Sequence, residues 1–101
     1  MIRDVNTFFE KMRQDAENMM PINATMKLSM ENYIFRIDGY GSKNIVTDED
    51  LESDCNVIID LETFLKIKNG FSDPVTELLE GIIDVEGDLG LAFRLKSLIS
   101  A

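Results

Sequence analysis

The sequence contains no histidine and no tryptophan, and its 101 residues include only one cysteine and two prolines. Without histidine the chain has no Ser-His-Asp triad, no Cys-His pair and no histidine-ligated zinc site. The single cysteine, Cys55, excludes an internal disulfide and a multi-cysteine zinc site. Its neighbours are acidic, which predicts a small buried hydrophobe rather than a reactive thiol. These absences exclude several classes of enzyme and of metal site.

Basic side chains are also scarce. Ten lysines and arginines stand against 19 acidic residues, which gives a net charge of −9 and a pI near 4.3. Nucleic acids and anionic membrane surfaces both require clustered cations, so the charge predicts that neither is a partner. The shortage is most pronounced in the second half, because residues 44–65 and 67–93 contain only one basic side chain, Lys68.

Length and hydropathy limit the classes of protein to which this chain can belong. A chain of 101 residues that is 45% hydrophobic predicts one domain over residues 1–101 with a modest core. No run of about 20 apolar residues is present, which predicts no stable membrane insertion. Met1-Ile2-Arg3-Asp4 lacks the apolar stretch of a signal peptide, and Ile99-Ser100-Ala101 is not a peroxisomal signal. We therefore expect a cytoplasmic protein.

The periodicity of apolar residues predicts the secondary structure. A helical period covers residues 5–20, and a period of two then predicts strands. Further helices are expected after the capping residues Asp60 and Asp73, the latter followed by Pro74, and from Leu89 onward. The expected strands are residues 24–30, 33–37, 43–47, 55–59 and 83–86. The order α-β-β-β-β-α-α-β-α predicts an α+β fold with one sheet and helices on one face.

The last predicted helix carries more apolar residues than a single contact face needs. One stripe is widened by residues on either side of it, so the helix must be covered on more than one side. Another chain or a bound apolar ligand would provide that cover. The apolar residues of this helix are Leu89, Leu91, Ala92, Phe93, Leu95, Leu98 and Ile99.

Two motifs that suggest ligand binding fail when their spacing and flanks are considered. Residues 48–54 alternate like a calcium loop, but Ser53 and Ile59 occupy the positions that need glycine and glutamate. A solvated turn without metal is predicted instead. Residues 87–90 have the GxxG form of a nucleotide-clamping loop, but acidic flanks would repel phosphates. They predict a tight strand-to-helix turn with Asp88 as the N-cap.

Two segments of the second half resemble the sterol carrier protein type-two domain, the nonspecific lipid-transfer family. The family shows an Ala-Asp-Cys-Thr-like strand and, later, Gly-Asn/Asp-Met-Gly-Leu-Ala-x-Lys-Leu. The matching segments here are Ser53-Asp54-Cys55-Asn56-Val57-Ile58-Ile59-Asp60 and Gly87-Asp88-Leu89-Gly90-Leu91-Ala92-Phe93-Arg94-Leu95. The match covers about residues 53–96. Glu80 and Ile82-Ile83-Asp84 depart from it, because lysines are usual there in the family.

The resemblance implies an α+β domain with a five-stranded mixed sheet, helices covering one face, and an apolar tunnel between them. Members of the family bind fatty acids, fatty acyl-CoA and sterols without catalysis. By this analogy, the ligand-binding residues fall into a strand-to-helix motif and a preceding helical segment. They are Leu89, Leu91, Ala92, Phe93 and Leu95 from the motif, and Phe64, Leu65, Phe71, Val75, Leu78 and Leu79 from the helical segment.

These observations lead us to expect a non-enzymatic carrier that holds a fatty acid, acyl or sterol-like amphiphile, with the last helix as a movable wall and no cofactor. The acidic surface favours an acyl-chain binder over a carrier that docks on anionic membranes. An alternative stays open at this point: the apolar helix face would equally suit an interaction module that forms a homodimer and has no lipid role.

Overall fold

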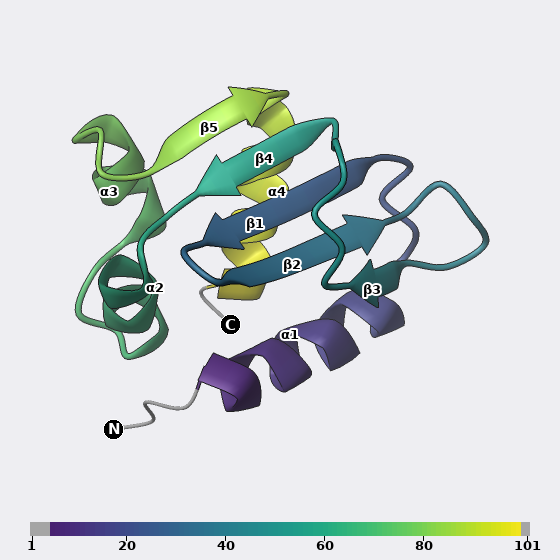
Figure 1. Cartoon of the computed structure of the whole chain (residues 1–101), viewed down its shortest axis with the longest axis horizontal. Helices are drawn as coiled ribbons and strands as arrows, with labels where there is room; N and C mark the ends of the chain where they lie inside the picture. Colours follow the sequence, from purple (N-terminus) through teal and green to yellow (C-terminus); the bar gives the residue numbers. More distant parts are fainter. Residues whose placement is uncertain (1–4, 100–101) are drawn as a thin grey trace.

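The fold is an α+β arrangement of four helices and one five-stranded sheet within residues 5–99, the part that this computed structural model describes (Figure 1). Side chains are described for these residues except Val5, Leu95, Leu98 and Ile99. The order of elements is the predicted one. The elements are α1 (Val5–Asn18), β1 (Thr25–Met30), β2 (Tyr33–Asp38), β3 (Ile45–Thr47), β4 (Cys55–Ile58), α2 (Leu61–Lys68), α3 (Pro74–Leu79), β5 (Asp84–Gly87) and α4 (Leu89–Ile99).

The sheet is mixed, with strand order β3-β2-β1-β4-β5. The central strand β1 pairs antiparallel with β2, its hairpin partner, and parallel with β4. Glu31 in the hairpin turn has a φ of 40°, which closes the short connection. Because side chains alternate across a strand, one face of the sheet is apolar and buried, as at Met26, Leu28 and Val57. The predicted five-stranded sheet with one covered face is confirmed.

All four helices lie on the apolar face. In Figure 1, α4 crosses behind the sheet and α1 runs along its β2–β3 side, while α2 and α3 stand at the end where β4 finishes. Phe64 of α2 is fully buried and meets Phe8 of α1 edge to face, with 6.0 Å between ring centroids. Met12, Met26 and Met30 are buried beside them, so flexible methionine side chains fill much of this core.

A buried asparagine joins α1 to the sheet. Asn44, which lies just before β3, is 1% exposed. Its Nδ2 donates to the carbonyl oxygens of Ala16 at 2.8 Å and Met20 at 3.1 Å, and its Oδ1 accepts from the backbone N–H of Ile22 at 3.0 Å. These carbonyls belong to the end of α1 and the turn after it, where a helix lacks its regular backbone donors; the carbonyl oxygen of Ala16 also accepts from Met19 N at 3.2 Å. Asn44 therefore caps the helix from a distant part of the chain.

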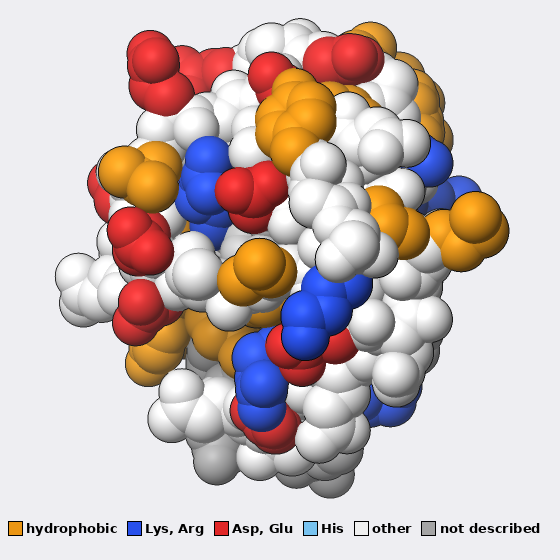
Figure 2. Space-filling model, turned by 90° about the vertical axis from the view of Figure 1, so that its right-hand side faces the viewer, with side chains coloured by type: hydrophobic (Ala, Val, Ile, Leu, Met, Phe, Trp, Pro, Cys, Tyr) orange, Lys and Arg blue, Asp and Glu red, His pale blue; other side chains and the backbone are white. Residues whose placement is uncertain are grey.

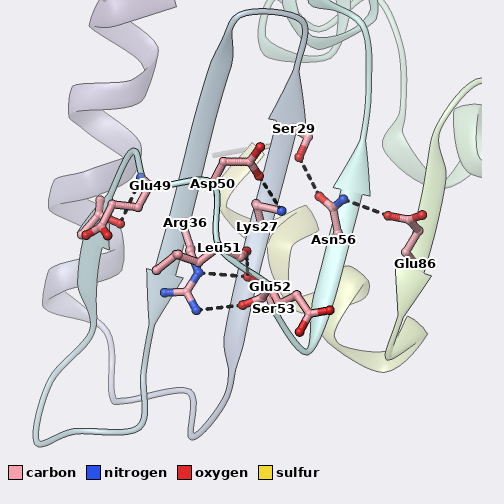
Figure 3. Close-up of polar contacts among 11 residues, drawn as sticks. Lys27, Ser29, Arg36, Glu49, Asp50, Leu51, Glu52, Ser53, Asn56 and Glu86 are labelled. Carbon is pink, nitrogen blue, oxygen red and sulfur yellow. Dashed lines mark hydrogen bonds and ion pairs between the residues drawn. The ribbon is translucent and has the colours of Figure 1, made fainter.

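The other face of the sheet is largely polar and is crossed by the acidic connection between β3 and β4 (Figure 3). Lys27 Nζ lies 2.7 Å from Asp50 Oδ1, and Arg36 donates to Ser53 Oγ and to the carbonyl oxygen of Glu52, both at 3.0 Å. The sequence predicted a turn here; the structure adds that two basic side chains hold it against the sheet. Within the described residues, no group of three or more Cys, Asp or Glu side chains is placed to hold a metal ion.

Acidic N-caps begin the three helices of the second half, as predicted. Asp60 Oδ1 accepts from Thr63 N at 2.7 Å, Asp73 caps α3, and Asp88 Oδ1 accepts from Gly90 N at 2.8 Å. The hydrogen bonds from Thr63 hold the pKa of Asp60 below its ordinary value. Of the helices within residues 5–99, none is long and apolar enough to cross a membrane.

Candidate functional site

A small apolar pocket lies between the β4–β5 edge of the sheet and the last two helices. Its sheet wall is Val57, Ile83 and Val85, of which Val57 and Val85 are paired across β4 and β5. Pro74, Val75 and Leu78 of α3 and Ala92, Phe93 and Lys96 of α4 form the opposite walls. Apart from Lys96, every lining residue is apolar, so the site suits a hydrocarbon group.

The local sequence explains this arrangement. Val57 and Val85 project to the same face because their strands are paired in register and each alternates in and out. On α4, Lys96 follows Ala92 by four residues and Phe93 by three, which places the three side chains on one side of the helix. Ile83 and Val57 are buried and form the floor, whereas Phe93 and Lys96 are exposed and therefore border the opening.

The wall made by α3 is the most loosely held. This helix has six residues, none of them buried. It is flanked by Gly70 and Gly81, whose φ angles of 78° and 77° lie in the left-handed region that glycine adopts without strain. By contrast, α4 contacts β1, β4 and β5 as well as the other three helices. Segments with few buried apolar contacts open most readily, so α3 is the wall best suited to move.

The pocket is too small for an acyl chain in this conformation. Its cavity volume is about 30 Å³, whereas sites for ligands of moderate size usually enclose about 300–1,000 Å³. The apolar tunnel that the family resemblance implied is therefore only a small, partly open pocket here.

The predicted ligand-binding residues fall into separate environments. Val75, Leu78, Ala92 and Phe93 come together in the pocket. Phe64 and Leu91 are buried in the core, and Leu65 is half-buried against it. Leu79 is 81% exposed, Phe71 69% and Leu89 50%, and none of these three lines the pocket. The side chain of Leu95 lies outside the described residues. A ligand role for the residues outside the pocket stays a prediction.

Sequence reasoning did not assign five of the residues that line the pocket. Val57, Ile83 and Val85 lie in predicted strands, and their alternation was the signal that could have placed them beside the helices. Pro74 indicates only the start of a helix in the sequence. Lys96 is polar and so stands outside the apolar pattern of α4, although its spacing from Ala92 and Phe93 places it on their side of the helix.

The one thiol near this region is poorly suited to nucleophilic chemistry. Cys55 is fully buried at the start of β4. Burial, followed by the nearby charge of Asp88, raises the pKa of this thiol to about 11. Since the thiolate is the reactive species, Cys55 is protonated and unreactive near neutral pH. The predicted role as a buried hydrophobe agrees with this burial.

A second, open hollow of about 460 Å³ lies beside Tyr40, Asp54, Asp88 and Arg94. Each of these polar side chains already has a hydrogen-bond partner within the protein. The Tyr40 hydroxyl and the Thr25 N–H donate to Asp54 Oδ2, and these bonds hold the pKa of Asp54 below its ordinary value. Asp88 Oδ1 accepts from Gly90 N. Arg94 donates to the carbonyl oxygen of Ile22 at 3.0 Å. On the face shown in Figure 2, basic side chains lie beside acidic ones, without a broad positive field. The hydrogen bonds around this hollow therefore connect neighbouring loops. Its polar lining makes it less suited to a lipid than the apolar pocket.

A family profile described as the SCP-2 sterol transfer family matches residues 5–100. A comparison with curated proteins found no match.

Solved structures of sterol carrier proteins share the fold. Palmitated SCP2L2 from Aedes aegypti has a TM-score of 0.72 and 20% identity, and the similarity covers 96% of this chain and 95% of that one. Apo sterol carrier protein 2 from Yarrowia lipolytica has a TM-score of 0.71 at 14% identity, with coverages of 98% and 95%. The palmitate complex of Aedes aegypti sterol carrier protein 2 has a TM-score of 0.70 at 15% identity, with coverages of 99% and 96%.

Proposed function

This chain belongs to the SCP-2 sterol transfer family, and we propose that it is a non-enzymatic cytoplasmic carrier that binds a lipid with an apolar chain in the pocket beneath α3. One observation carries this proposal: an apolar pocket stands behind the least anchored helix of the fold. Two proteins with a similar fold, both from Aedes aegypti, were solved with palmitate.

The energetics favour an acyl chain once the pocket opens. Each methylene moved from water into an apolar site contributes about 0.8 kcal/mol, so eight buried methylenes contribute roughly 6 kcal/mol. Part of this offsets the cost of separating α3 from the sheet and of immobilising the ligand. Because no side chain of α3 is fully buried, the opening exposes little core. This supports α3, rather than the last helix that the sequence suggested, as the movable wall.

Two adjacent leucines of α3 test the position of the site. Leu78 lines the pocket, whereas Leu79 faces solvent. Leu78→Asn places an amide in the apolar wall, where an uncompensated polar group costs about 1–3 kcal/mol, so we expect the dissociation constant of a fluorescent fatty acid to rise about tenfold. Leu79→Asn makes the same chemical change outside the pocket and should alter it less than twofold. Circular dichroism of both variants serves as the control for folding.

The same titration can contradict the proposal. Failure of the unmodified protein to bind the fluorescent fatty acid at micromolar concentration, together with an empty protein in native mass spectrometry, would remove the lipid role. If Leu78→Asn and Leu79→Asn weaken binding of the fatty acid equally, the ligand does not bind in this pocket.

Exposed apolar side chains keep the homodimer as a second candidate. Phe71, Leu79 and Ile82 are exposed around α3, and a second copy of the chain would shield such residues from water. Light scattering after size exclusion tests this candidate. A tight dimer whose Leu79→Asn variant is monomeric would favour it, and a monomer at high micromolar concentration would exclude it.

A further inference from the structure

We propose that Lys96 pairs with the carboxylate of a fatty acid at the opening of the apolar pocket, so that the site selects a fatty acid over an uncharged lipid such as a sterol. This inference rests on the proposed lipid binding. It identifies the head group of the ligand, which the apolar walls alone leave open.

The position of Lys96 supports this role. Lys96 is the charged member of the pocket lining, and it shares one side of α4 with Ala92 and Phe93. The floor at Val57 and Ile83 is buried, while Lys96 is exposed to solvent. A ligand whose hydrocarbon end rests on this floor therefore has its head group near the lysine ammonium. Long lysine side chains commonly keep the stem on apolar surface and the charge in water.

Lys96 also lacks the partners that most other basic residues have. Lys11, Lys27 and Lys66 each form an ion pair with an acidic side chain. Lys96 has neither an ion pair nor a hydrogen bond with any side chain that the structure describes. In a chain with 19 acidic and 10 basic residues, a lysine left unpaired at the edge of an apolar pocket is available to an external anion.

The charge of the ligand follows from this arrangement. The net charge of −9 repels anions in general, so a fatty acid needs a local cation beside its carboxylate. A single ammonium suits a single carboxylate, whereas a sterol or a fatty alcohol presents a hydroxyl and gains no charge pair. Exposed charge pairs are modest and are screened by salt. We therefore expect a preference of about fivefold for the acid, and a smaller one at high ionic strength.

Laurate and dodecanol separate the charged head group from the chain, because both have twelve carbons. Their affinities are measured by displacement of a fluorescent lipid from the unmodified protein, Lys96→Gln and Lys43→Gln. Lys43 is exposed in the β2–β3 connection and does not line the pocket, so Lys43→Gln controls for the change in net charge. We expect the unmodified protein and Lys43→Gln to bind laurate about fivefold more tightly than dodecanol. Lys96→Gln should bind both equally and keep the affinity for dodecanol.

Each other outcome points to a specific error. The assignment of Lys96 is overturned if the unmodified protein binds laurate and dodecanol equally, or if Lys96→Gln keeps the preference for laurate. Either result leaves the proposal that the lipid binds in the pocket unaffected. Loss of the preference in Lys43→Gln as well means that net charge selects the acid, which also overturns it. Failure of both ligands to bind contradicts the proposed lipid binding itself.

Discussion

Replacing Asn44 should show how much of the stability depends on one buried side chain. Asn44→Ala removes the three hydrogen bonds that join the end of α1 and the turn after it to the β2–β3 connection. A typical intramolecular hydrogen bond contributes about 1 kcal/mol, and a buried partner left without a bond adds to the loss. Ile22, whose N–H donates to Asn44, is buried. We expect the free energy of unfolding to fall by about 3 kcal/mol.

This loss is large for a domain of this size, since single domains are stable by only about 5–15 kcal/mol. At about 4–8 °C for each kcal/mol, the melting temperature should fall by about 15 °C. Asn18→Ala is the matched control, because Asn18 is an exposed residue of the same helix. Urea unfolding followed by circular dichroism gives both free energies.

Asn44→Asp extends the test, because it keeps the acceptor for Ile22 but turns a carboxylate toward the carbonyl oxygens of Ala16 and Met20. Its stability should be at least as low as that of Asn44→Ala. If both substitutions at Asn44 change the free energy of unfolding by no more than Asn18→Ala does, the capping role is refuted.

Three further predictions concern the start of β4 and the end of β5 beside it. Gly87→Ala should destabilise the fold by about 3 kcal/mol or more, because the φ of Gly87 is 88° and a Cβ there would lie 2.2 Å from the carbonyl oxygen of Asp54. Gly81→Ala, with a φ of 77° and open space around it, should cost only about 1 kcal/mol in the same urea titration; equal losses would contradict the close contact. Cys55 should resist iodoacetamide at pH 8 until urea unfolds the chain, as judged by mass spectrometry, and rapid labelling of the native protein would contradict its burial. Because folding raises the pKa of this thiol from about 9 to about 11, its contribution to stability is complete below pH 9 and is lost as the pH rises through 11.

The elements of the fold were predictable because each carries a local signal. Alternation identified β1 and β2, and Asp60 and Asp73 marked helix starts through their own side-chain chemistry. The parallel pairing of β1 with β4 was not predictable from such signals, since it joins residues about 30 positions apart. The same reason hides the role of Asn44, whose partners lie more than 20 residues away.

The candidate site was predictable in part. The family resemblance pointed to Ala92 and Phe93, and both line the pocket, but it did not distinguish which of two neighbouring leucines of α3 points inward. Leu78 does so and Leu79 does not, and with six residues α3 is too short for its apolar pattern to show which side faces the sheet. The sheet wall of the pocket depends on which strands are neighbours, and this is a property of the whole fold.

The parallel pairing of β1 with β4 has a consequence for biosynthesis. When residues 1–47 have left the ribosome, the hairpin of β1 and β2 can form, but β1 still lacks its second neighbour. Its backbone edge stays unpaired until residues 55–58 emerge, and its apolar side chains are fully covered only when α4 has emerged as well. An exposed strand edge of this kind can pair with other chains. The nascent chain is therefore most prone to aggregate during this interval, and a chaperone that shields β1 then would raise the yield of folded protein.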